Sequence, residues 1–300
     1  MKPICIITGA TGFIGRAISR FLRDQGYPVH GLSRNPDKES GLARWNPQKL
    51  DGWEHIIKKA GVIINLAGHS IGKSRWTKKT KSHILNSRIQ STNILIKALR
   101  KTNSRPDLFI QISGVGYYGS RGDEIVDENS TPGSGFLAHV SREWETATNY
   151  LEKMNIRLVT FRTGLVLGSN GGAVKRLVPP FRFFLGGPFG PGTQWVSWIH
   201  LTDVCRAMEF AISRKKISGI FNLTSPQPVA NQQMAQTIGK ILNRPAFFRL
   251  PAWIIKVRLG EMGQDLLLSG QRALPRRLQQ EGFDFKYPDL HSGLHNILSR

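Results

Sequence analysis

The sequence of 300 residues predicts an α/β fold with a doubly wound parallel sheet. Three observations support this prediction. Strand and helix patterns alternate in the first half of the chain, most strand-like runs are continuously apolar, and a glycine-rich turn follows the first run. Continuous apolar runs are typical of parallel strands buried on both faces. The predicted strands are residues 4–8, 29–33, 62–66, 108–113, 158–163 and 220–223.

Apolar residues at helical spacing lie between these strands. Residues 13–22 predict the first helix, which should end near Gly26. Residues 84–99 predict a long helix after the third strand, and residues 136–151 predict another between the fourth and fifth strands. The alternation places helices on both faces of the sheet.

The glycine-rich turn reads ITGATGFIG, with Gly9, Gly12 and Gly15 in the order G-x-x-G-x-x-G. Gly9 permits a tight turn, Gly12 leaves room for a pyrophosphate, and Gly15 lets the helix and the strand pack closely. The helix N-terminus offers unpaired N–H groups to the phosphates. The turn therefore predicts a Rossmann domain that binds a nicotinamide dinucleotide. Its predicted contacts are Gly9, Ala10, Thr11, Gly12, Phe13, Ile14 and Gly15.

The end of the second strand favours NADP(H) over NAD(H). NAD-specific sites usually carry an acidic residue there, which bonds the ribose 2′-hydroxyl. This chain has Ser33 and Arg34 instead, and a guanidinium can form paired hydrogen bonds with a 2′-phosphate.

The organisation of the chain changes after Gly168. Glycines and prolines mark a loop-rich insertion at about residues 168–195 of a Rossmann domain that we assign to residues 1–225. Residues 226–300 carry short helical patterns and no further run of buried strands. We therefore expect a small C-terminal substrate or cap domain in residues 226–300.

The composition is strongly basic, with 42 Lys and Arg against 20 Asp and Glu and a formal net charge of +22. Such a charge raises affinity for polyanions, but the basic residues are scattered and no nucleic-acid motif accompanies them, so nucleic-acid binding is not expected. No apolar run is long enough to cross a bilayer, and we recognise no signal peptide and no metal-binding spacing. Cys5 and Cys205 are expected to be buried free thiols in a cytoplasmic protein.

Ordered motifs along nearly the whole chain match one protein family. They include GATGFIG, INLAGHSI, GVGYYG, GFLAHVSREWE, RTGLVLGSNGGA, GGPFGPGTQWVSWIHLTDV and LGEMGQDLLLSGQR. On these motifs the chain resembles the extended (atypical) short-chain dehydrogenase/reductase superfamily, in its NAD(P)-dependent epimerase-family branch. This branch is also described as cell-division-inhibitor-like, with a C-terminal domain of undefined role. Many relatives dimerise, so the resemblance allows a homodimer here.

The resemblance implies further site residues. Ser113 stands where the superfamily keeps a Ser or Thr that bonds the reacting oxygen of the substrate. The segment that ends the third strand matches the one that lines the adenine and ribose of the cofactor, and Arg162 begins the segment that passes the nicotinamide. The implied cofactor contacts are Asn65, Leu66, Ala67, Gly68, Arg88 and Arg162.

One departure from the family pattern concerns catalysis. Working members need Tyr-x-x-x-Lys on the helix after Ser113, because the Lys lowers the pKa of the Tyr and the Tyr transfers a proton. Here Phe136 or Leu137 stands near the Tyr position, and Val140 or Ser141 stands near the Lys position. Hydride transfer by the usual route is therefore in doubt.

Two tyrosines after Ser113 offer a replacement proton donor. Tyr118 stands where the superfamily often has a Tyr that is not the acid, so a structural role is favoured for it. Tyr117 is open to either role, and we assign Ser113 and Tyr117 as the candidate catalytic residues.

The sequence leaves three functions open. The first is an NADP(H)-dependent oxidoreductase or epimerase-like enzyme for an unknown small molecule, which an arginine beside an aromatic residue at Arg75 and Trp76 suggests is anionic. Trp195 and Trp198 could wall its pocket, or could equally lie in the core. The second is an NADP(H)-binding sensor with little catalysis. The third, suggested by the net charge alone, is a nucleic-acid or membrane-surface partner.

Overall fold

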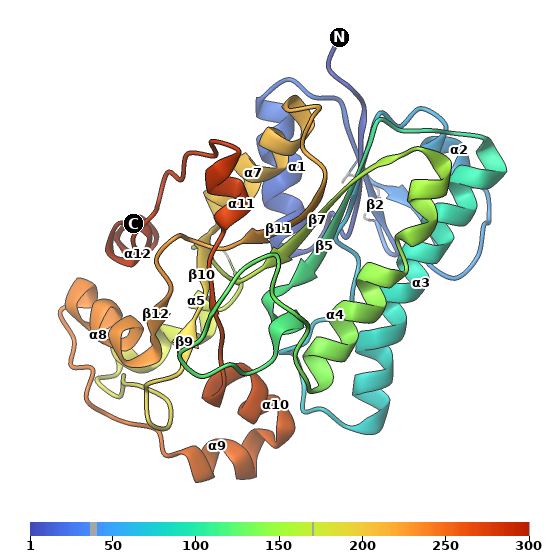
Figure 1. The fold of residues 1–300 in the computed structure, drawn as a ribbon. Helices are drawn as coiled ribbons and strands as arrows, with labels where there is room; N and C mark the ends of the chain where they lie inside the picture. The colour runs from blue at the N-terminus through green and yellow to red at the C-terminus, as the bar shows by residue number, and fades with distance from the viewer. Residues whose placement is uncertain (37–40, 170, 300) are drawn as a thin grey trace.

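The computed structural model describes residues 1–36, 41–169 and 171–299 and has a seven-stranded parallel sheet at its centre (Figure 1). The strand order is β11-β7-β5-β4-β1-β2-β3, so the chain starts in the middle of the sheet and extends it in both directions. The predicted fold class is confirmed. The strands are β1 (Cys5–Thr8), β2 (Val29–Ser33), β3 (Ala43–Arg44), β4 (Val62–Asn65), β5 (Leu108–Gly114), β7 (Arg157–Thr163) and β11 (Gly219–Leu223).

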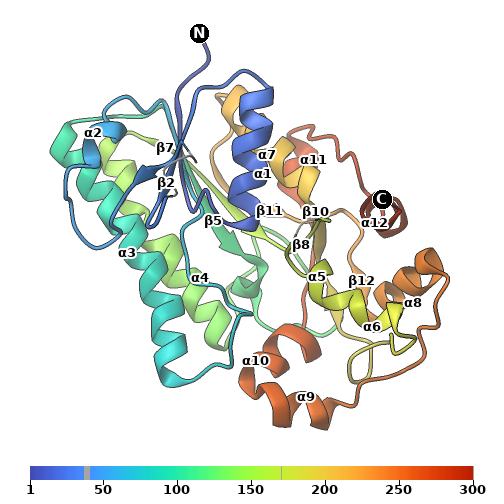
Figure 2. The same cartoon turned by 180° about the vertical axis from the view of Figure 1, so that it is seen from behind.

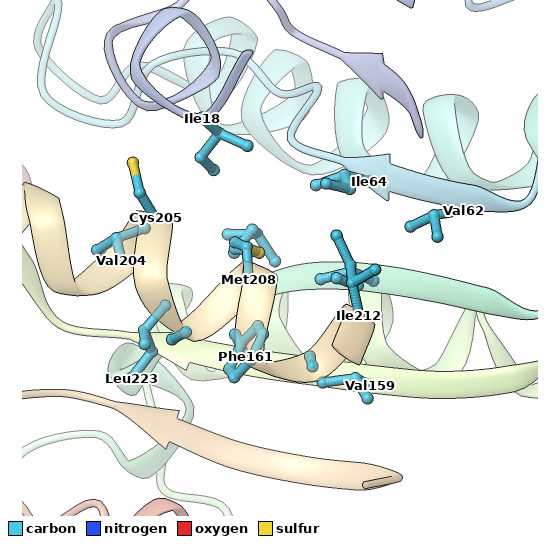
Figure 3. Packing of buried hydrophobic residues seen from close by; sticks show 14 of the residues in the cluster. Ile18, Val62, Ile64, Val159, Phe161, Val204, Cys205, Met208, Ile212 and Leu223 are labelled. Atoms are coloured by element: carbon cyan, nitrogen blue, oxygen red, sulfur yellow. The ribbon is translucent and has the colours of Figure 1, made fainter. Parts of the chain in front are cut away.

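Helices cover both faces of the sheet (Figure 2). One layer contains α1 (Phe13–Asp24) and α7 (Leu201–Ser213), and the other contains α2 (Glu54–Ile57), α3 (Lys78–Thr102) and α4 (Phe136–Thr146). Alternate strand residues face opposite layers, as the strand period requires. Ile7 belongs to the core under α1 and α7, which Figure 3 shows from close by, whereas Ile6 belongs to the core under α2 and α3.

Most of the remaining elements form a second body beside the carboxyl ends of the strands (Figure 1). Trp198 is fully buried in the core of this body, and its indole Nε1 donates a hydrogen bond to the Gln227 carbonyl oxygen at 2.9 Å. Trp198 is therefore a core residue. The elements are β6 (Ile125–Val126), β8 (Leu165–Leu167), α5 (Val174–Leu177), α6 (Pro179–Arg182), β9 (Trp195–Val196), β10 (Trp198–His200), β12 (Val229–Ala230), α8 (Asn231–Leu242), α9 (Ala252–Leu259), α10 (Glu261–Gly263), η3 (Gln264–Leu268), β13 (Arg272–Ala273) and α12 (Leu290–Leu298). In contrast, α11 (Arg276–Gln280) packs on β11 and contributes Leu278 to the core under α1 and α7, and the short helices η1 (Val115–Tyr118) and η2 (Asn149–Met154) flank β5 and β7.

The core of this body draws on residues from both sides of the predicted boundary at residue 225. It joins Val174 and Phe181 from the predicted insertion with Met234 and Leu294 from the C-terminal part. The division into residues 1–225 and 226–300 stays a prediction.

Two further observations concern the chemistry of the interior and the membrane. Cys5 and Cys205 are buried free thiols, as predicted, and burial raises the pKa of each to about 12. Within the described ranges, none of the helices combines the length and the apolar character that crossing a bilayer requires.

Candidate functional site

The candidate site lies at the carboxyl edge of the sheet, where β1 and β4 run side by side. The chain leaves β1 toward β2 on one side and returns to β4 on the other, and ligands of open parallel sheets bind at such a switch point. The glycine turn follows β1 at this point. Its geometry determines what can bind there.

Each glycine of the turn has a distinct structural reason. Gly9 has a φ of +67°, in the left-handed region that favours glycine. A Cβ on Gly15 would lie 2.2 Å from the Gly9 carbonyl oxygen, so only glycine lets α1 approach the turn. Gly12 differs, because its Cβ would meet only the same oxygen at 3.2 Å and would otherwise point into open space. The turn thus leaves an open position at the head of α1.

The N-terminus of α1 suits an anion. Gly12 is its N-cap, no side chain caps its first turn, and that turn contains no acidic residue. Its N–H groups and the positive end of the helix dipole are therefore available to a phosphate. Phe13 packs against the glycine-rich insertion, since a Cβ on Gly172 would lie 2.7 Å from its ring. Of the other predicted contacts in the turn, Ala10 is buried and Thr11 is exposed, and Ile14 is partly buried.

Positive charge gathers at the end of β2. Ser33 is buried and its hydroxyl accepts a hydrogen bond from the Asn35 N–H at 3.3 Å, whereas Arg34 is exposed. The pKa of His69, on the loop after β4, is lowered first by burial and then by four nearby basic side chains. These are His83, Lys73, Arg88 and Arg34. The cluster offers an electropositive environment beside the turn, which suits an added phosphate group.

Arg88, on α3, supports the loop after β4. Its guanidinium donates hydrogen bonds to the carbonyl oxygens of His69 at 2.9 Å and Ile84 at 2.8 Å, and it stacks on Trp144 at 4.9 Å. A Cβ on Gly68 would lie 3.1 Å from this guanidinium, and burial lowers the pKa of Arg88 to about 10. Arg88 therefore holds the loop in place.

The side chain of Asn65 forms its hydrogen bonds within the protein interior. It is fully buried, and its amide bonds the hydroxyls of Thr8 at 2.7 Å and Thr92 at 3.0 Å and the Gln111 side chain at 3.0 Å. Any cofactor contact here would come from its backbone or from Leu66, Ala67 and Gly68, which are not buried. Their predicted contacts stay predictions.

The reacting edge is built around Glu145, a residue that the sequence analysis missed. The Ser113 hydroxyl donates a hydrogen bond to Glu145 Oε1 at 2.8 Å. Arg162, which pairs with Ser113 in the β5–β7 register, binds the same carboxylate through Nε at 2.9 Å and Nη2 at 2.8 Å. Burial alone would lower the pKa of Arg162, but the hydrogen bonds and charge of Glu145 raise it overall. The ion pair is thus bidentate and nearly buried.

Both tyrosines after Ser113 contact Arg162 of this pair. Tyr118 is fully buried, donates to Asn222 Oδ1 at 2.7 Å and accepts from Arg162 Nη1 at 3.1 Å, and burial raises its pKa to about 12. These contacts agree with the structural role favoured for Tyr118. Tyr117 is partly exposed, with its ring centre 3.3 Å from the Arg162 guanidinium carbon, and its hydroxyl makes no hydrogen bond to the described part of the chain.

The helix α4 carries no proton donor of the usual kind at its start. Phe136 packs edge-on against Trp76 at 4.9 Å, and Leu137 packs against Gly116, whose Cβ would lie 2.9 Å from the Leu137 Cβ. Val140 is buried, and the Ser141 hydroxyl donates to the Gly114 carbonyl oxygen at 3.5 Å. The positions of the missing Tyr and Lys are filled by packing.

The C-terminal segment closes the site from the other side. Gly260 abuts Arg75, since a Cβ there would lie 3.2 Å from Arg75 Nε, and Lys81 pairs with Glu261 at 2.7 Å. Burial and then the Glu261 charge raise the pKa of Asp265, on η3, against the opposing charge of Lys81.

Trp195 also lies near this segment. It is half-buried, its Nε1 donates to Asp123 Oδ1 at 2.7 Å, and Arg272 lies over its ring at 4.3 Å. Arg272 Nε is buried without a hydrogen-bond partner among the residues described. Unlike Trp198, Trp195 stays a candidate for a pocket wall.

Comparisons with known proteins agree with this geometry. The profile of the NAD dependent epimerase/dehydratase family matches residues 5–224, and that of a domain of unknown function (DUF1731) matches residues 250–297. The epimerase family protein YfhF of Bacillus subtilis is 38% identical over 298 residues, covering 98% of this chain and 97% of the relative.

Solved structures extend the match. The crystal structure of the human epimerase family protein SDR39U1 with NADPH is 32% identical and superposes with a TM-score of 0.90 over 99% of each chain. A nucleoside-diphosphate sugar epimerase from Corynebacterium glutamicum is 31% identical, with a TM-score of 0.81 over 99% of this chain and 58% of its own. The resemblance found in the sequence is confirmed, and the chain belongs to the NAD dependent epimerase/dehydratase family.

Proposed function

We propose that this chain binds NADP(H) at the turn between β1 and α1. The observation that carries the proposal is Gly12, which opens space at an uncapped helix N-terminus where a Cβ would intrude on a bound pyrophosphate. The human relative SDR39U1, 32% identical, was crystallised with NADPH, which supports the same ligand class here.

A preference for the phosphorylated cofactor would come from Arg34 and its neighbours. Arg34 is exposed at the end of β2, and its charge reaches His69. A 2′-phosphate bound between them would gain charge-assisted hydrogen bonds that a ribose hydroxyl cannot match.

The reacting centre of the proposed enzyme is Ser113 with Tyr117. Because the Ser113 proton is shared with Glu145, its oxygen is free to accept a hydrogen bond from a substrate hydroxyl. Glu145 is a positioning residue, because its carboxylate holds both the Ser113 hydroxyl and the Arg162 guanidinium. Tyr117 is the group with a free hydroxyl, and we assign it the proton transfer to or from the reacting oxygen.

A bound nicotinamide would exchange a hydride with the carbon that carries this oxygen. The substrate would enter between the reacting edge and the C-terminal segment, where Arg75 and Arg272 favour an anionic molecule.

The second candidate is an NADP(H)-binding sensor without turnover. The packing of Phe136, Leu137 and Val140 favours it, because these side chains fill the start of α4 with apolar contacts and leave no Tyr–Lys pair. Both candidates share the same cofactor site and differ only in the role of Tyr117.

Thermal unfolding with NADPH, NADP⁺, NADH and NAD⁺ tests the cofactor site. A ligand at about 100 times its Kd stabilises the native state by roughly 2.7 kcal/mol, which should raise Tm by several degrees. We expect the larger shift with the phosphorylated forms, and Arg34→Ala should weaken NADPH by about tenfold or more without changing NADH. No shift with any dinucleotide, in protein shown to be cofactor-free, would contradict the proposal.

Turnover separates enzyme from sensor. NADPH absorbance would be followed with panels of carbonyl compounds and nucleotide sugars, and Tyr117→Phe should then reduce kcat by about 100-fold or more. Tyr150→Phe, on an exposed tyrosine far from the edge, is the matched control. Unchanged turnover in Tyr117→Phe would remove Tyr117 from the mechanism, and binding with no turnover on any substrate would favour the sensor.

A further inference from the structure

Most of the exposed large hydrophobic side chains in the described part of the chain lie in two segments of the second body. Phe183 and Phe247 are each 73% exposed and Trp253 is 67% exposed, which is far beyond what scattered surface residues require. We call the set the aromatic–basic face. Its apolar members are Phe183, Phe184, Leu185, Phe247, Phe248, Leu250, Trp253 and Val257.

The two segments form one surface because their backbones are paired. The Phe248 N–H donates to the Gly186 carbonyl oxygen at 3.1 Å, and the Leu250 N–H donates to the Pro188 carbonyl oxygen at 3.0 Å. The Arg244 guanidinium also lies over the Phe184 ring at 4.6 Å. The aromatic side chains are therefore held outward by an ordered scaffold.

The helix α9 continues the face with an exposed apolar stripe. Trp253 and Val257 are one helical turn apart and are 67% and 66% exposed, whereas Ile255 on the opposite side is 1% exposed. Lys256 and Arg258 flank the stripe and are exposed. Figures 1 and 2 show α9 at the outer margin of the molecule.

The two stretches that carry these side chains contain charge of one sign, and Glu261, which follows α9, is paired with Lys81 at 2.7 Å. The sequence contains no Asp or Glu between residues 171 and 202 or between residues 210 and 260, the two stretches that build the face. Its exposed cations are Arg182, Arg244, Arg249, Lys256 and Arg258. Long basic side chains can lay their stems along apolar surface while their charged ends stay in water.

This combination suits the surface of an anionic bilayer. Aromatic and aliphatic tips enter the boundary between headgroups and acyl chains, and the surrounding cations meet the negative headgroups. An apolar face for a second copy of this chain would have five cations facing five cations, which opposes self-association. Leu185, Phe248 and Leu250 also border an apolar cavity of about 380 Å³, which gives an acyl chain a recess to enter.

We propose that the aromatic–basic face docks this protein peripherally on anionic lipid membranes. The proposal is independent of the proposed cofactor chemistry, because none of its residues belongs to the candidate site. It also gives the large net charge a local use.

Co-sedimentation of the full chain with lipid vesicles tests it. We expect binding to vesicles of phosphatidylcholine mixed with phosphatidylglycerol, little binding to phosphatidylcholine alone, and release by salt. The triple variant Arg182→Gln/Arg249→Gln/Arg258→Gln should weaken partitioning by about 100-fold. The triple variant Phe183→Ser/Phe247→Ser/Trp253→Ser should weaken it by about tenfold or more.

Lys58→Gln/Lys59→Gln/Arg105→Gln is the matched control, since it removes the same charge from exposed positions on the Rossmann side. It should leave partitioning within about twofold of the parent. An equal loss in this control would overturn the proposal in favour of a diffuse effect of net charge. Parent binding that is no stronger with phosphatidylglycerol would overturn it as well. Light scattering tests the alternative that a second copy of this chain binds the face. A dimer that dissociates only in the aromatic variant would overturn the membrane proposal in favour of self-association.

Discussion

The edge after β1 and the edge after β5 belong to one sheet, yet they relate to the family pattern in opposite ways. After β1, the turn keeps every glycine that the dinucleotide geometry needs, and Gly12 leaves its position open. After β5, Ser113 is kept, but the start of α4 is apolar, and a buried ion pair between Glu145 and Arg162 occupies the neighbourhood. Cofactor binding and proton transfer thus depend on separate parts of the fold.

A chain that keeps the cofactor-binding turn therefore need not keep the usual proton donor. The glycine turn depends on backbone conformation and on the absence of Cβ atoms, and few sequences can form it. The proton donor is one side chain that another nearby group could replace. In this chain the neighbouring candidate is Tyr117, stacked 3.3 Å from the Arg162 guanidinium carbon. Variants that act on one edge alone can show how independent the two edges are.

The largest effect is expected at the ion pair. Glu145→Ala should lower the free energy of unfolding by about 3–5 kcal/mol, because it leaves the Arg162 charge buried and unpaired. Denaturant unfolding followed by fluorescence measures this loss. Glu143→Ala, two residues earlier on the exposed side of α4, should change stability by less than about 1 kcal/mol.

A double variant sharpens this result. Replacing both partners, as Glu145→Leu with Arg162→Met, should recover most of the lost stability, because no buried charge remains. If the double variant is as unstable as Glu145→Ala, the pair is needed for the packing of β7 against α4. The edge after β5 could then not be altered without disturbing the rest of the sheet.

At the other edge, Gly12→Ala should abolish most cofactor binding while leaving the fold intact. Within the described part of the protein the new Cβ would meet only the Gly9 carbonyl oxygen, at 3.2 Å, which a shift of a few tenths of an ångström relieves, but it would occupy the volume assigned to a pyrophosphate. A 100-fold loss of NADPH affinity would reduce ligand stabilisation from about 2.7 to about 0.4 kcal/mol at the same concentration. Titration of NADPH fluorescence measures the affinity. Gly15→Ala, with its 2.2 Å clash, should by contrast destabilise the apo protein, and wild-type affinity in Gly12→Ala would refute this use of the turn.

The strands of the central sheet are the part of the fold that could be predicted best from the sequence. Most of the six predicted strands could be found because burial on both faces makes parallel strands continuously apolar. The seventh strand, β3, has only two residues and pairs with the end of β2, too short for any pattern. The helix predicted over residues 136–151 ends at Thr146, and the Thr148 hydroxyl bonds the Glu145 carbonyl oxygen at 2.6 Å, competing with a continuing helix.

Within the candidate site, the glycine turn was easier to predict from the sequence than the pairing of buried side chains. Glu145 was missed because the letters SREWE contain two acids and sequence alone did not separate them. Two signals could have found it. Helical spacing places Glu145 on the face of the buried Ala138 and Ser141, and an arginine within a buried strand, as at Arg162, requires a carboxylate partner.

The smallest effect concerns the pH dependence of the proposed 2′-phosphate contact. In the free protein, burial and neighbouring cations hold the pKa of His69 below its ordinary value of 6.5, so the ring is neutral at neutral pH. A bound 2′-phosphate would raise that pKa, so binding takes up a proton and the affinity for NADPH should rise as pH falls through the range from about 8 to 5. The phosphate also takes up a proton near pH 6, which opposes the rise equally in every variant. His69→Gln should therefore flatten the rise by about tenfold or less at the acid end. NADH, which lacks the phosphate, provides the comparison, and calorimetric titration across this range measures both. An identical rise for NADH would mean that His69 senses the pyrophosphate shared by both cofactors, and the preference assigned to the end of β2 would then have to rest on Arg34 alone.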